Sequence, residues 1–437
     1  MDGVLYLFPY LLLGVAAIAW HVWRRERRHR VETETLAQAR QAGLMEPPSL
    51  HPVVDPNRCL GSGACAKACP EGALGVVNGK ATLINAASCI GHGACAAACP
   101  VQALSLVFGT EKRGMDIPNI SPEFETNVPG VYIAGELGGM GLIRKTAEQG
   151  RQAMDAIRRR AAAGHAAPLD VVIVGAGPAG ISAGLSAIAH KLRYKIVEQE
   201  DSLGGAVYHY PRNKLAMTAP VKLDLVGTVR LGTEVQKEKL LAFWHEIVGK
   251  TGLTMSFNER FEGLTPRADG SYDVRTSRGT YHAHSVLLAL GRRGTPRKLG
   301  VPGEEMAKVV YRLVDAEQYA GRHVLVVGGG DSALEAAVSL AAEPGTTVTL
   351  SYRSEAFSRV KEKNRQQLDD AVRRGRISCL MKSQVQRIEE TQVLLQLDGG
   401  ESRALPNEHV IVCAGGELPT PLLKSIGIRF ETKFGRA

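Results

Sequence analysis

Six of the eight cysteines lie between Cys59 and Cys99, where they form two copies of one spacing pattern. Each copy reads C-x5-C-x3-C-P, within the similar segments DPNRCLGSGACAKACPEGAL and NAASCIGHGACAAACPVQAL. In a reducing compartment such clustering indicates a metal site rather than disulfides. The sequence therefore predicts metal binding by six thiolates, those of Cys59, Cys65, Cys69, Cys89, Cys95 and Cys99.

This repeat resembles the dicluster ferredoxins of bacteria, whose run is C-x2-C-x2-C-x3-C-P and whose fourth cysteine serves the other cluster. The resemblance implies a small α+β ferredoxin domain over residues 52–108. Three thiolates per cluster suit a [3Fe-4S] cluster, or a [4Fe-4S] cluster whose fourth iron takes a side chain or water. By this crossed ligation the sets are Cys59, Cys65 and Cys99 for one cluster, and Cys89, Cys95 and Cys69 for the other.

At the second-cysteine position of the ferredoxin run, this chain has Ser62 in one half and His92 in the other. Imidazole is a competent iron ligand, and a non-cysteine ligand raises the potential of a cluster, so His92 is a candidate ligand. Ser62 is a weaker candidate because a hydroxyl must lose its proton to bind iron well. The alternatives are a surface histidine in a glycine turn, a domain that has lost its metal, and zinc in place of iron.

A nucleotide-binding pattern follows the cysteines: VVIVGAGPAG places Gly175, Gly177 and Gly180 at G-x-G-x-x-G spacing after an apolar strand. The first glycine permits a tight turn, the second admits a pyrophosphate, and the third lets helix and strand pack closely. Glu198 ends the next expected strand, where a carboxylate binds ribose hydroxyls. Further contacts expected at this site are Pro178, Ala179 and Gly205.

A second pattern of this kind, VLVVGGGDSALEA, begins at Val324. The nucleotide contacts predicted from it are Gly328, Gly330, Asp331, Ser332 and Ala333. Its second strand is followed by Arg353 and Arg359 rather than by an acidic residue. Because arginine pairs with a 2′-phosphate, these residues favour NADPH over NADH, with solvated surface arginines as the alternative.

Residues 110–437 resemble the thioredoxin-reductase-like flavoprotein reductases, which contain two dinucleotide-binding domains. VVIVGAGPAG resembles their FAD fingerprint, VVGGGDSALEAA their NAD(P) fingerprint, and VLLALGRRGTPRKLGVPGE the link between the two domains. TNVPGVYIAGE…AEQGRQA resembles their closing FAD segment, where Gly135 and the acid after it meet the ribityl chain and pyrophosphate. That acid is usually aspartate, and here it is Glu136. The resemblance implies two Rossmann-like three-layer α/β domains.

Two departures from this group are evident. The stretch before the second fingerprint, YRLVDAEQYAGR, lacks the redox Cys-x-x-Cys of thioredoxin reductases. Cys379 and Cys413 stand alone, and Cys413 is expected to be buried inside an apolar strand. Dithiol chemistry is therefore excluded.

The second departure is a permuted order, because the closing segment precedes Asp170. The chain stops after GELPTPLLKSIGIRFETKFGRA, where relatives of the group continue into TNVPGVYIAGD. Termini that lie close together at a surface make such a rearrangement feasible. We therefore expect Ala437 near residues 110–120, and residues 126–160 as the completion of the FAD sheet that begins at Asp170.

The start of the chain predicts a membrane anchor. Residues 4–23 contain no Lys, Arg, Asp or Glu, and about 20 helical residues match a hydrocarbon core of about 30 Å. The run RRERRHR that follows provides much of the net charge of +9. Its position favours a single-pass helix in the inner (cytoplasmic) membrane with the catalytic part in the cytoplasm, and argues against both a cleaved signal peptide and nucleic-acid binding.

The 437 residues thus predict a multidomain oxidoreductase. The expected segments are an anchor with a basic stop (1–30), a linker (31–51), the ferredoxin domain (52–108), the closing FAD segment (109–165), the FAD domain (166–300), the NAD(P) domain (301–405) and a return to the FAD domain (406–437). Nicotinamide gives up electron pairs and a cluster takes single electrons, so FAD between them acts as a converter. We predict electron flow from NAD(P)H through FAD to two iron–sulfur clusters and on to a one-electron acceptor.

Several aspects of this function stay open. The direction could be reversed, as in a ferredoxin-type NAD(P)+ reductase, or the chain could be a redox sensor or electron-transfer subunit without turnover. A cytochrome or a quinone-linked complex is the acceptor considered, and a homodimer is one assembly considered. Hydride transfer requires no general acid or base, so no catalytic side chain is assigned. Tyr208, Tyr210 and Lys214 are candidates to line the flavin, with ordinary packing as the alternative.

Overall fold

The computed structural model describes residues 2–41, 45–48, 50–111, 113–139, 141–232, 234–292, 296–357 and 360–435. They divide into two compact units. Unit 1 comprises Met1–Lys112, Ala356–Arg365 and Gly435–Ala437, and unit 2 comprises Arg113–Glu355 and Gln366–Phe434.

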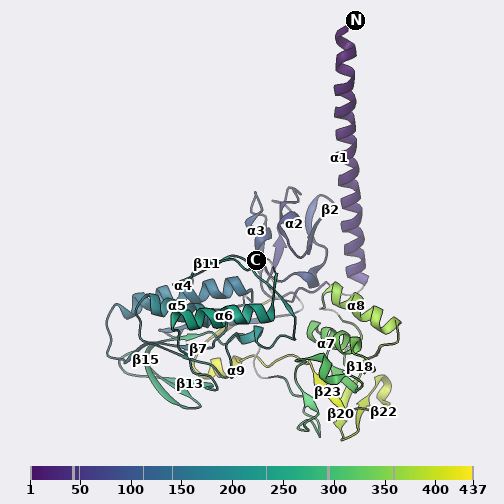
Figure 1. Cartoon of the computed structure of the whole chain (residues 1–437). Coiled ribbons are helices and arrows are strands. Elements are labelled where there is room, and N and C mark those ends of the chain that lie inside the picture. Colours follow the sequence, from purple (N-terminus) through teal and green to yellow (C-terminus); the bar gives the residue numbers. More distant parts are fainter. Residues whose placement is uncertain are drawn as a thin grey trace. The chain divides into compact units, whose positions relative to one another are not determined.

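The chain begins with α1 (Asp2–Gln41), a single helix of 40 residues, drawn in purple in Figure 1. The expected basic stop and much of the expected linker belong to this helix, because residues 24–41 contain neither glycine nor proline. Leu36 and Ala39 near its end are buried. The Glu32 carboxylate also accepts the backbone N–H of Val76 at 2.8 Å, which fixes the end of α1 within unit 1.

The prediction of a membrane anchor over residues 4–23 is wrong. Across the described residues, no helix provides an apolar stretch of the length needed to cross a bilayer. The inner-membrane location and the membrane as a partner were inferred from the same segment, so both predictions are withdrawn together with the anchor.

The remainder of unit 1 contains two small antiparallel sheets and one short helix from each cysteine repeat. The sheets pair β1 (His51–Val54) with β4 (Leu104–Val107), and β2 (Leu74–Val77) with β3 (Lys80–Leu83). The helices are α2 (Ala64–Ala68) and α3 (Ala94–Ala97). Each helix is entered through a glycine in the left-handed region, Gly63 (φ +72°) and Gly93 (φ +78°), so the two halves share one local fold.

Unit 2 contains a six-stranded sheet in the order β13-β14-β15-β7-β8, with β6 paired to β15. Its strands are β6 (Val131–Ile133), β7 (Leu169–Val174), β8 (Tyr194–Val197), β13 (Phe261–Pro266), β14 (Tyr272–Thr276) and β15 (Gly279–Leu288). The helices α4 (Ile143–Ala161), α5 (Pro178–Ala189) and α6 (Lys237–Thr251) lie along this sheet in Figure 1. The parallel pairing of β6 with β15 agrees with the expectation that residues 126–160 complete the sheet begun at Asp170.

Both faces of β7 are buried, as a continuous apolar strand requires. Val171 and Ile173 face a cluster that includes α4 and α5, whereas Val172 and Val174 face a second cluster. The second cluster includes Leu423 of α9 (Thr420–Ser425). The sheet is therefore covered on both sides, as expected for a three-layer domain.

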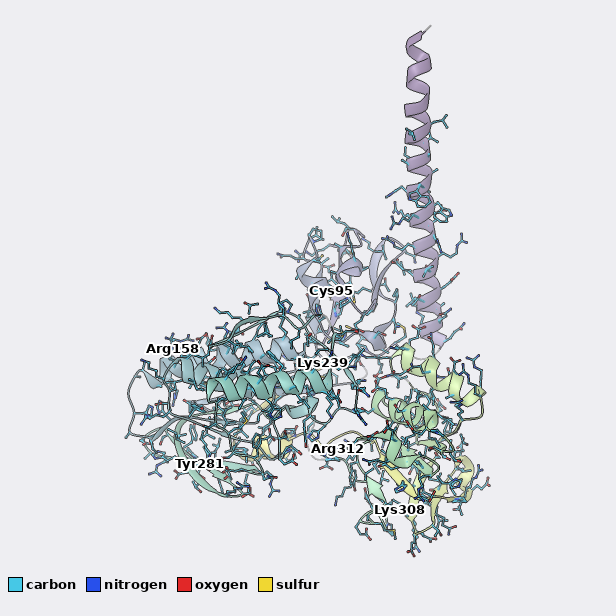
Figure 2. The ribbon with its side chains drawn as sticks, in the orientation of Figure 1. Cys95, Arg158, Lys239, Tyr281, Lys308 and Arg312 are labelled. Carbon is cyan, nitrogen blue, oxygen red and sulfur yellow. The ribbon has the colours of Figure 1, made fainter. Side chains whose placement is uncertain are left out.

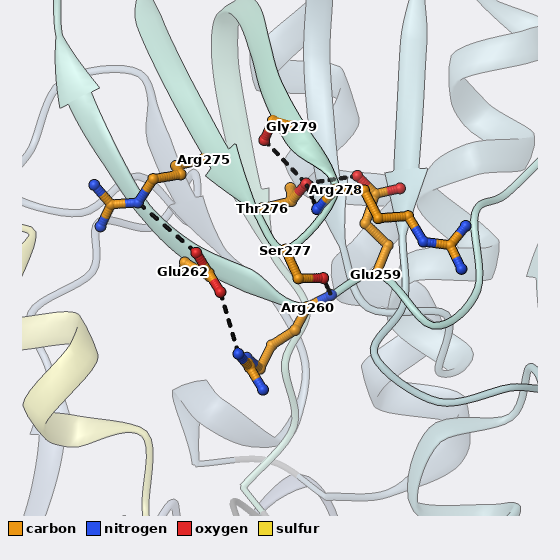
Figure 3. Close-up of polar contacts among 8 residues, drawn as sticks. All are labelled: Glu259, Arg260, Glu262, Arg275, Thr276, Ser277, Arg278 and Gly279. Carbon is orange, nitrogen blue, oxygen red and sulfur yellow. Dashed lines mark hydrogen bonds and ion pairs between the residues drawn. The ribbon is translucent and has the colours of Figure 1, made fainter.

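Polar contacts fix the antiparallel edge of this sheet (Figure 3). The Thr276 hydroxyl donates to the buried Glu259 carboxylate at 2.6 Å and lies 3.1 Å from the Gly279 carbonyl. Glu262 pairs with Arg260 at 3.1 Å and with Arg275 at 3.9 Å across the strands. These contacts stabilise the turn between β14 and β15. They thereby fix the register of β15, the long strand that also pairs with the parallel strands β6 and β7.

A second sheet of unit 2 is parallel, in the order β16-β23-β17-β18-β19. Its strands are β16 (Val309–Val310), β17 (His323–Val327), β18 (Thr347–Tyr352), β19 (Ile377–Met381) and β23 (His409–Val412), and α7 (Asp331–Ala342) follows β17. A three-stranded antiparallel sheet adjoins it in sequence, made of β20 (Gln384–Ile388), β21 (Gln392–Gln396) and β22 (Ser402–Pro406). The shorter elements are β9 (Leu215–Met217), β10 (Val221–Leu223), β11 (Gly227–Val229), β12 (Glu234–Gln236) and α8 (Glu362–Arg373).

The last strand returns to the start of unit 2. β24 (Phe430–Lys433) pairs antiparallel with β5 (Met115–Pro118), and the N–H of Gly435 donates to the Phe108 carbonyl at 2.8 Å. Ala437, expected near residues 110–120, lies outside the described residues. The pairing of β24 with β5 is nevertheless what the permuted order of segments requires.

Gly150 provides a test of the packing between the permuted closing segment and the rest of the sheet domain. A Cβ at Gly150 of α4 would lie 2.1 Å from the backbone oxygen of Ala179 in α5. We expect Gly150→Ala to destabilise the protein by about 1–3 kcal/mol, because one of two packed helices must move. The matched variant Gly249→Ala, at an exposed α6 position with nothing within 4 Å, should stabilise by up to about 1 kcal/mol. Urea unfolding measures the free energy of unfolding of both variants. Equal changes in the two variants would contradict the close crossing of α4 and α5.

Candidate functional site

The six cysteines of unit 1 form two groups, and each group draws from both sequence repeats. The charges of Cys59 and Cys99 act on Cys65, whose pKa is raised first by burial and further by these neighbours. Burial likewise raises the pKa of Cys95 to about 11, with Cys89 and Cys69 adding to the effect. The neighbours that act on Cys65 and Cys95 are thus members of the same predicted crossed sets, and the role of these sets as cluster ligands stays a prediction.

A cavity marks the position of the second set. Cys69, Cys89 and Cys95 line it together with the glycine-flanked loop that carries His92. Cys95 is labelled on α3 in Figure 2. Three thiols therefore line one cavity, whereas His92, the candidate fourth ligand, is exposed in its loop, as the alternative of a surface histidine in a glycine turn expects. Within the described ranges, no three or more His, Cys, Asp or Glu side chains converge on a single metal ion.

Ser62, the counterpart of His92 in the first repeat, is exposed. Its hydroxyl lies 3.5 Å from the backbone N–H of Ala64, at the entrance to α2.

Backbone N–H groups donate hydrogen bonds to two of the cysteine sulfurs. The Ala81 N–H lies 3.4 Å from Cys59 Sγ, and the Ala103 N–H lies 3.3 Å from Cys99 Sγ. Hydrogen bonds of this kind stabilise thiolate charge and tune the reduction potential of a cluster.

The first dinucleotide site lies at the carboxyl ends of β7 and β8. Gly175 has φ +110°, and a Cβ at Gly180 would lie 1.8 Å from the Gly175 oxygen, so the turn and the helix are in direct contact. Gly205 also lies close to this turn, since a Cβ at this position would lie 2.9 Å from the Cα of Gly177. Pro178 occupies the first turn of α5, and Ala179 beside it is buried. The backbone is therefore shaped to admit a pyrophosphate at the start of α5.

Glu198 is placed to bind the ribose. It is buried at the end of β8, and its carboxylate accepts the Ala176 N–H at 2.6 Å. Burial raises the pKa of Glu198, against the lowering effect of this hydrogen bond and that from Glu200. A buried carboxylate beside the fingerprint turn is the environment in which ribose hydroxyls are bound.

The permuted closing segment reaches the same site. Gly135 (φ +90°) lies so near α5 that its Cβ would be 3.3 Å from the Cβ of Ala179, and its N–H donates to the Gln149 side chain at 2.9 Å. Glu136 begins a single 3-10 turn directly after it, and its charge acts on the largely buried Arg292. Sequence reasoning missed Gln149 and Arg292, although Gln149 lies inside the motif AEQGRQA.

The second dinucleotide site lies at the carboxyl ends of β17, β18 and β23. A Cβ at Gly328 would lie 2.4 Å from the Cys413 oxygen, whereas Gly330 has nothing within 4 Å and leaves room for a ligand. Asp331 begins α7, Ser332 follows it, and Ala333 is fully buried. Arg353 comes directly after β18 and is exposed. Arg359, the other arginine expected here, lies outside the described residues.

Cys413 differs from the expectation. It follows Val412, the last residue of β23, and is half-buried rather than enclosed in the strand. Its N–H donates to the Val327 carbonyl at 2.7 Å, which places it beside the fingerprint turn of Gly328. The apolar run that suggested a longer buried strand therefore ends one residue earlier than expected.

The three side chains proposed to line the flavin have other contacts. Lys214 Nζ lies 2.5 Å from the Glu335 carboxylate on α7. Hydrogen bonding to Asp201 raises the pKa of Tyr208, and the Tyr210 side chain is partly buried against the core cluster that includes α4 and α5. These contacts fit the alternative of ordinary packing.

Comparison with known proteins finds a match for both the dinucleotide-binding part and the cysteine-rich part of the chain. The pyridine nucleotide-disulphide oxidoreductase family model matches residues 172–434, and the 4Fe-4S dicluster domain model matches residues 51–100. Bacilliredoxin reductase Bdr of Bacillus subtilis is 26% identical over 269 residues, which are 61% of this chain and 82% of that protein. A ferredoxin–NADP reductase of Thermus thermophilus is 31% identical over 257 residues, 56% of this chain and 72% of that protein. The solved bacillithiol disulfide reductase from Bacillus cereus superposes with a TM-score of 0.52 at 25% identity, over 59% of this chain and 81% of that one.

Proposed function

Because this chain belongs to the pyridine nucleotide-disulphide oxidoreductase family and carries a 4Fe-4S dicluster domain, we propose that it passes electrons from NADPH through FAD to its iron–sulfur clusters. It is a flavin-dependent oxidoreductase that uses FAD, a nicotinamide nucleotide and two iron–sulfur clusters. The observation that carries the proposal is that one chain holds two dinucleotide sites and two crossed groups of three cysteines. FAD accepts a hydride from a nicotinamide and releases electrons singly, which is the conversion that clusters need.

The residues of unit 2 fit FAD in the first site. The start of α5 and the glycine backbone at Gly175 and Gly177 would hold the pyrophosphate, and Glu198 would bind the ribose. Gly135 and Glu136 would lie along the ribityl chain, since the structure places Gly135 beside Ala179. This chain's side chains thereby bind and orient the cofactor, and no general acid or base is needed for hydride transfer.

Electrons must leave the flavin by a route other than a redox dithiol. The segment YRLVDAEQYAGR contains no cysteine, and Cys379 lies within β19 whereas Cys413 directly follows β23. The six thiolates of unit 1 would hold iron–sulfur clusters, and the iron of such clusters accepts single electrons. We propose the crossed sets as the ligands of two clusters, with His92 as a further ligand of the second cluster and a one-electron carrier such as a cytochrome as the final acceptor.

A second candidate is the reverse reaction, in which reduced clusters deliver electrons through FAD to NADP+. Its support is that several similar proteins are named ferredoxin–NADP reductase, including those of Thermus thermophilus and Pediococcus pentosaceus. Cluster potentials span roughly −700 to +450 mV, so the parts themselves permit either direction.

Anaerobic rapid mixing with NADPH tests the proposal. We expect the flavin absorbance to bleach first and the cluster absorbance to fall afterwards, within the time of one turnover. Slow or absent flavin bleaching would contradict the enzyme and favour a redox sensor. Flavin bleaching with clusters that stay oxidised would instead favour the reverse direction.

A further inference from the structure

Lys382 follows β19 beside Arg353, which follows β18, and the sequence motifs do not point to it. In the parallel sheet, Tyr352 of β18 is opposite Met381 of β19, so Arg353 and Lys382 are the next residues on neighbouring strands. Two backbone hydrogen bonds continue beyond the strands, from Lys382 N–H to the Ser354 carbonyl at 3.1 Å and from Ser383 N–H to the Tyr352 carbonyl at 3.0 Å. Because neighbouring strands lie about 5 Å apart, two cationic side chains start side by side at the ligand-binding edge of the sheet.

The backbone at Lys382 is held in an uncommon conformation. Its φ is +48°, in the left-handed region that side-chain-bearing residues rarely adopt. A buried pair of serine hydroxyls fixes this bend, since Ser351 Oγ lies 2.7 Å from Ser383 Oγ. Backbone outliers of this kind persist where the surrounding structure determines them, and they concentrate at ligand sites.

Arg353 and Lys382 line one open, polar cavity of about 600 Å³. Its other charged lining residues are Glu355 and Asp398, and the Lys382 ammonium lies 3.6 Å from the first carboxylate and 3.1 Å from the second. Hydrogen bonding to Asp398 raises the pKa of Lys382, so the side chain stays cationic. Cavities of roughly 300–1,000 Å³ are the size that bind small molecules such as nucleotides.

We propose that Lys382 is a second specificity residue, which binds the 2′-phosphate of NADPH together with Arg353. In the absence of nucleotide, Asp398 and Glu355 hold the ammonium over the cavity. A 2′-phosphate carries close to two negative charges near neutral pH and accepts several hydrogen bonds, so it competes for the ammonium with the carboxylates of Asp398 and Glu355. The 2′-hydroxyl of NADH offers no such charge, so Lys382 contributes to binding of NADPH and little to binding of NADH.

This inference rests on the proposed use of NADPH at the second dinucleotide site, and a binding measurement tests it without turnover. Calorimetric titration of the full holoprotein with NADP+, NAD+, 2′,5′-ADP and 5′-AMP compares ligands with and without the phosphate. We expect Lys382→Gln to weaken binding of NADP+ and 2′,5′-ADP about tenfold, as for loss of one charge-assisted hydrogen bond, while NAD+ changes less than about twofold. Lys382→Arg should retain the preference for the phosphorylated ligands.

Arg387→Gln is the matched control, because Arg387 is exposed on β20 of the adjoining sheet and does not line the cavity. It removes the same charge and should change neither affinity by more than about twofold if the effect is local. Equal weakening of NADP+ and NAD+ by Lys382→Gln, or no weakening of either, would overturn the assignment. The titration measures nucleotide binding and does not depend on electron flow to the clusters. The assignment of Lys382 can therefore be tested even if the proposed electron flow is wrong.

Discussion

Cys95→Ser is expected to cost the protein one of its two clusters while leaving its flavin chemistry intact. The residue sits on α3 and shares a cavity wall with Cys69 and Cys89, so its loss leaves two thiols for that cluster. Iron and acid-labile sulfide should fall by about half, since the other crossed set keeps its three thiols. NADPH should still bleach the flavin at a rate within about twofold of the unchanged protein, because FAD is bound by other residues.

Cys379→Ser controls for the chemistry of the substitution itself. Cys379 is half-buried on β19, outside the ferredoxin domain, and its thiol lies near the Met381 sulfur. This variant should keep the full content of iron and sulfide. Full iron content in Cys95→Ser, or equal loss in both variants, would mean that the crossed sets are not the cluster ligands.

Gly180→Ala should produce the opposite defect, a protein with clusters but without tightly bound FAD. The added methyl would lie 1.8 Å from the Gly175 oxygen, and neither backbone can yield without opening the turn that receives the pyrophosphate. Strain of about 1–3 kcal/mol at that turn corresponds to roughly a tenfold or greater loss of FAD affinity. The ratio of flavin to protein after gel filtration measures this directly.

Gly330→Ala separates the two nucleotide sites. A methyl at Gly330 meets nothing within 4 Å in the protein, so the fold and the FAD content should be unchanged. It would occupy space beside the second fingerprint turn, so the KM for NADPH should rise. Loss of flavin in Gly330→Ala, or retention of flavin in Gly180→Ala, would contradict the assignment of the two sites.

Much of the site could be predicted from local spacing. The two fingerprints and the paired cysteine repeats each fix a short stretch of backbone, and the structure places Gly175, Gly180 and Gly328 in the close contacts that only glycine permits. The crossed grouping of cysteines was predicted from the resemblance to dicluster ferredoxins, in which the last cysteine of each run serves the other cluster. The permuted order could be inferred because the closing segment keeps a recognisable motif around Gly135.

What could not be predicted depends on contacts between distant segments. The charge of Glu136 acts on Arg292 only because the fold brings the two segments together, and the register of β18 and β19 places Lys382 beside Arg353, which no local pattern encodes. The helical continuity of α1 was missed for another reason. An apolar run followed by arginines has the composition of an anchor, but the residues after it are helix formers whose last turns pack against β2.

The central claim is that electrons from a nicotinamide reach iron held by the thiols of unit 1. Low-temperature EPR of the anaerobically purified protein, recorded before and after addition of NADPH, tests it most directly. The account predicts that NADPH alone changes the cluster signals: the signal of an oxidised [3Fe-4S] cluster falls, or that of a reduced [4Fe-4S] cluster rises, with the electrons supplied. Gly180→Ala should abolish the change. Cluster signals that respond to dithionite but stay unchanged with NADPH in flavin-loaded protein would contradict it.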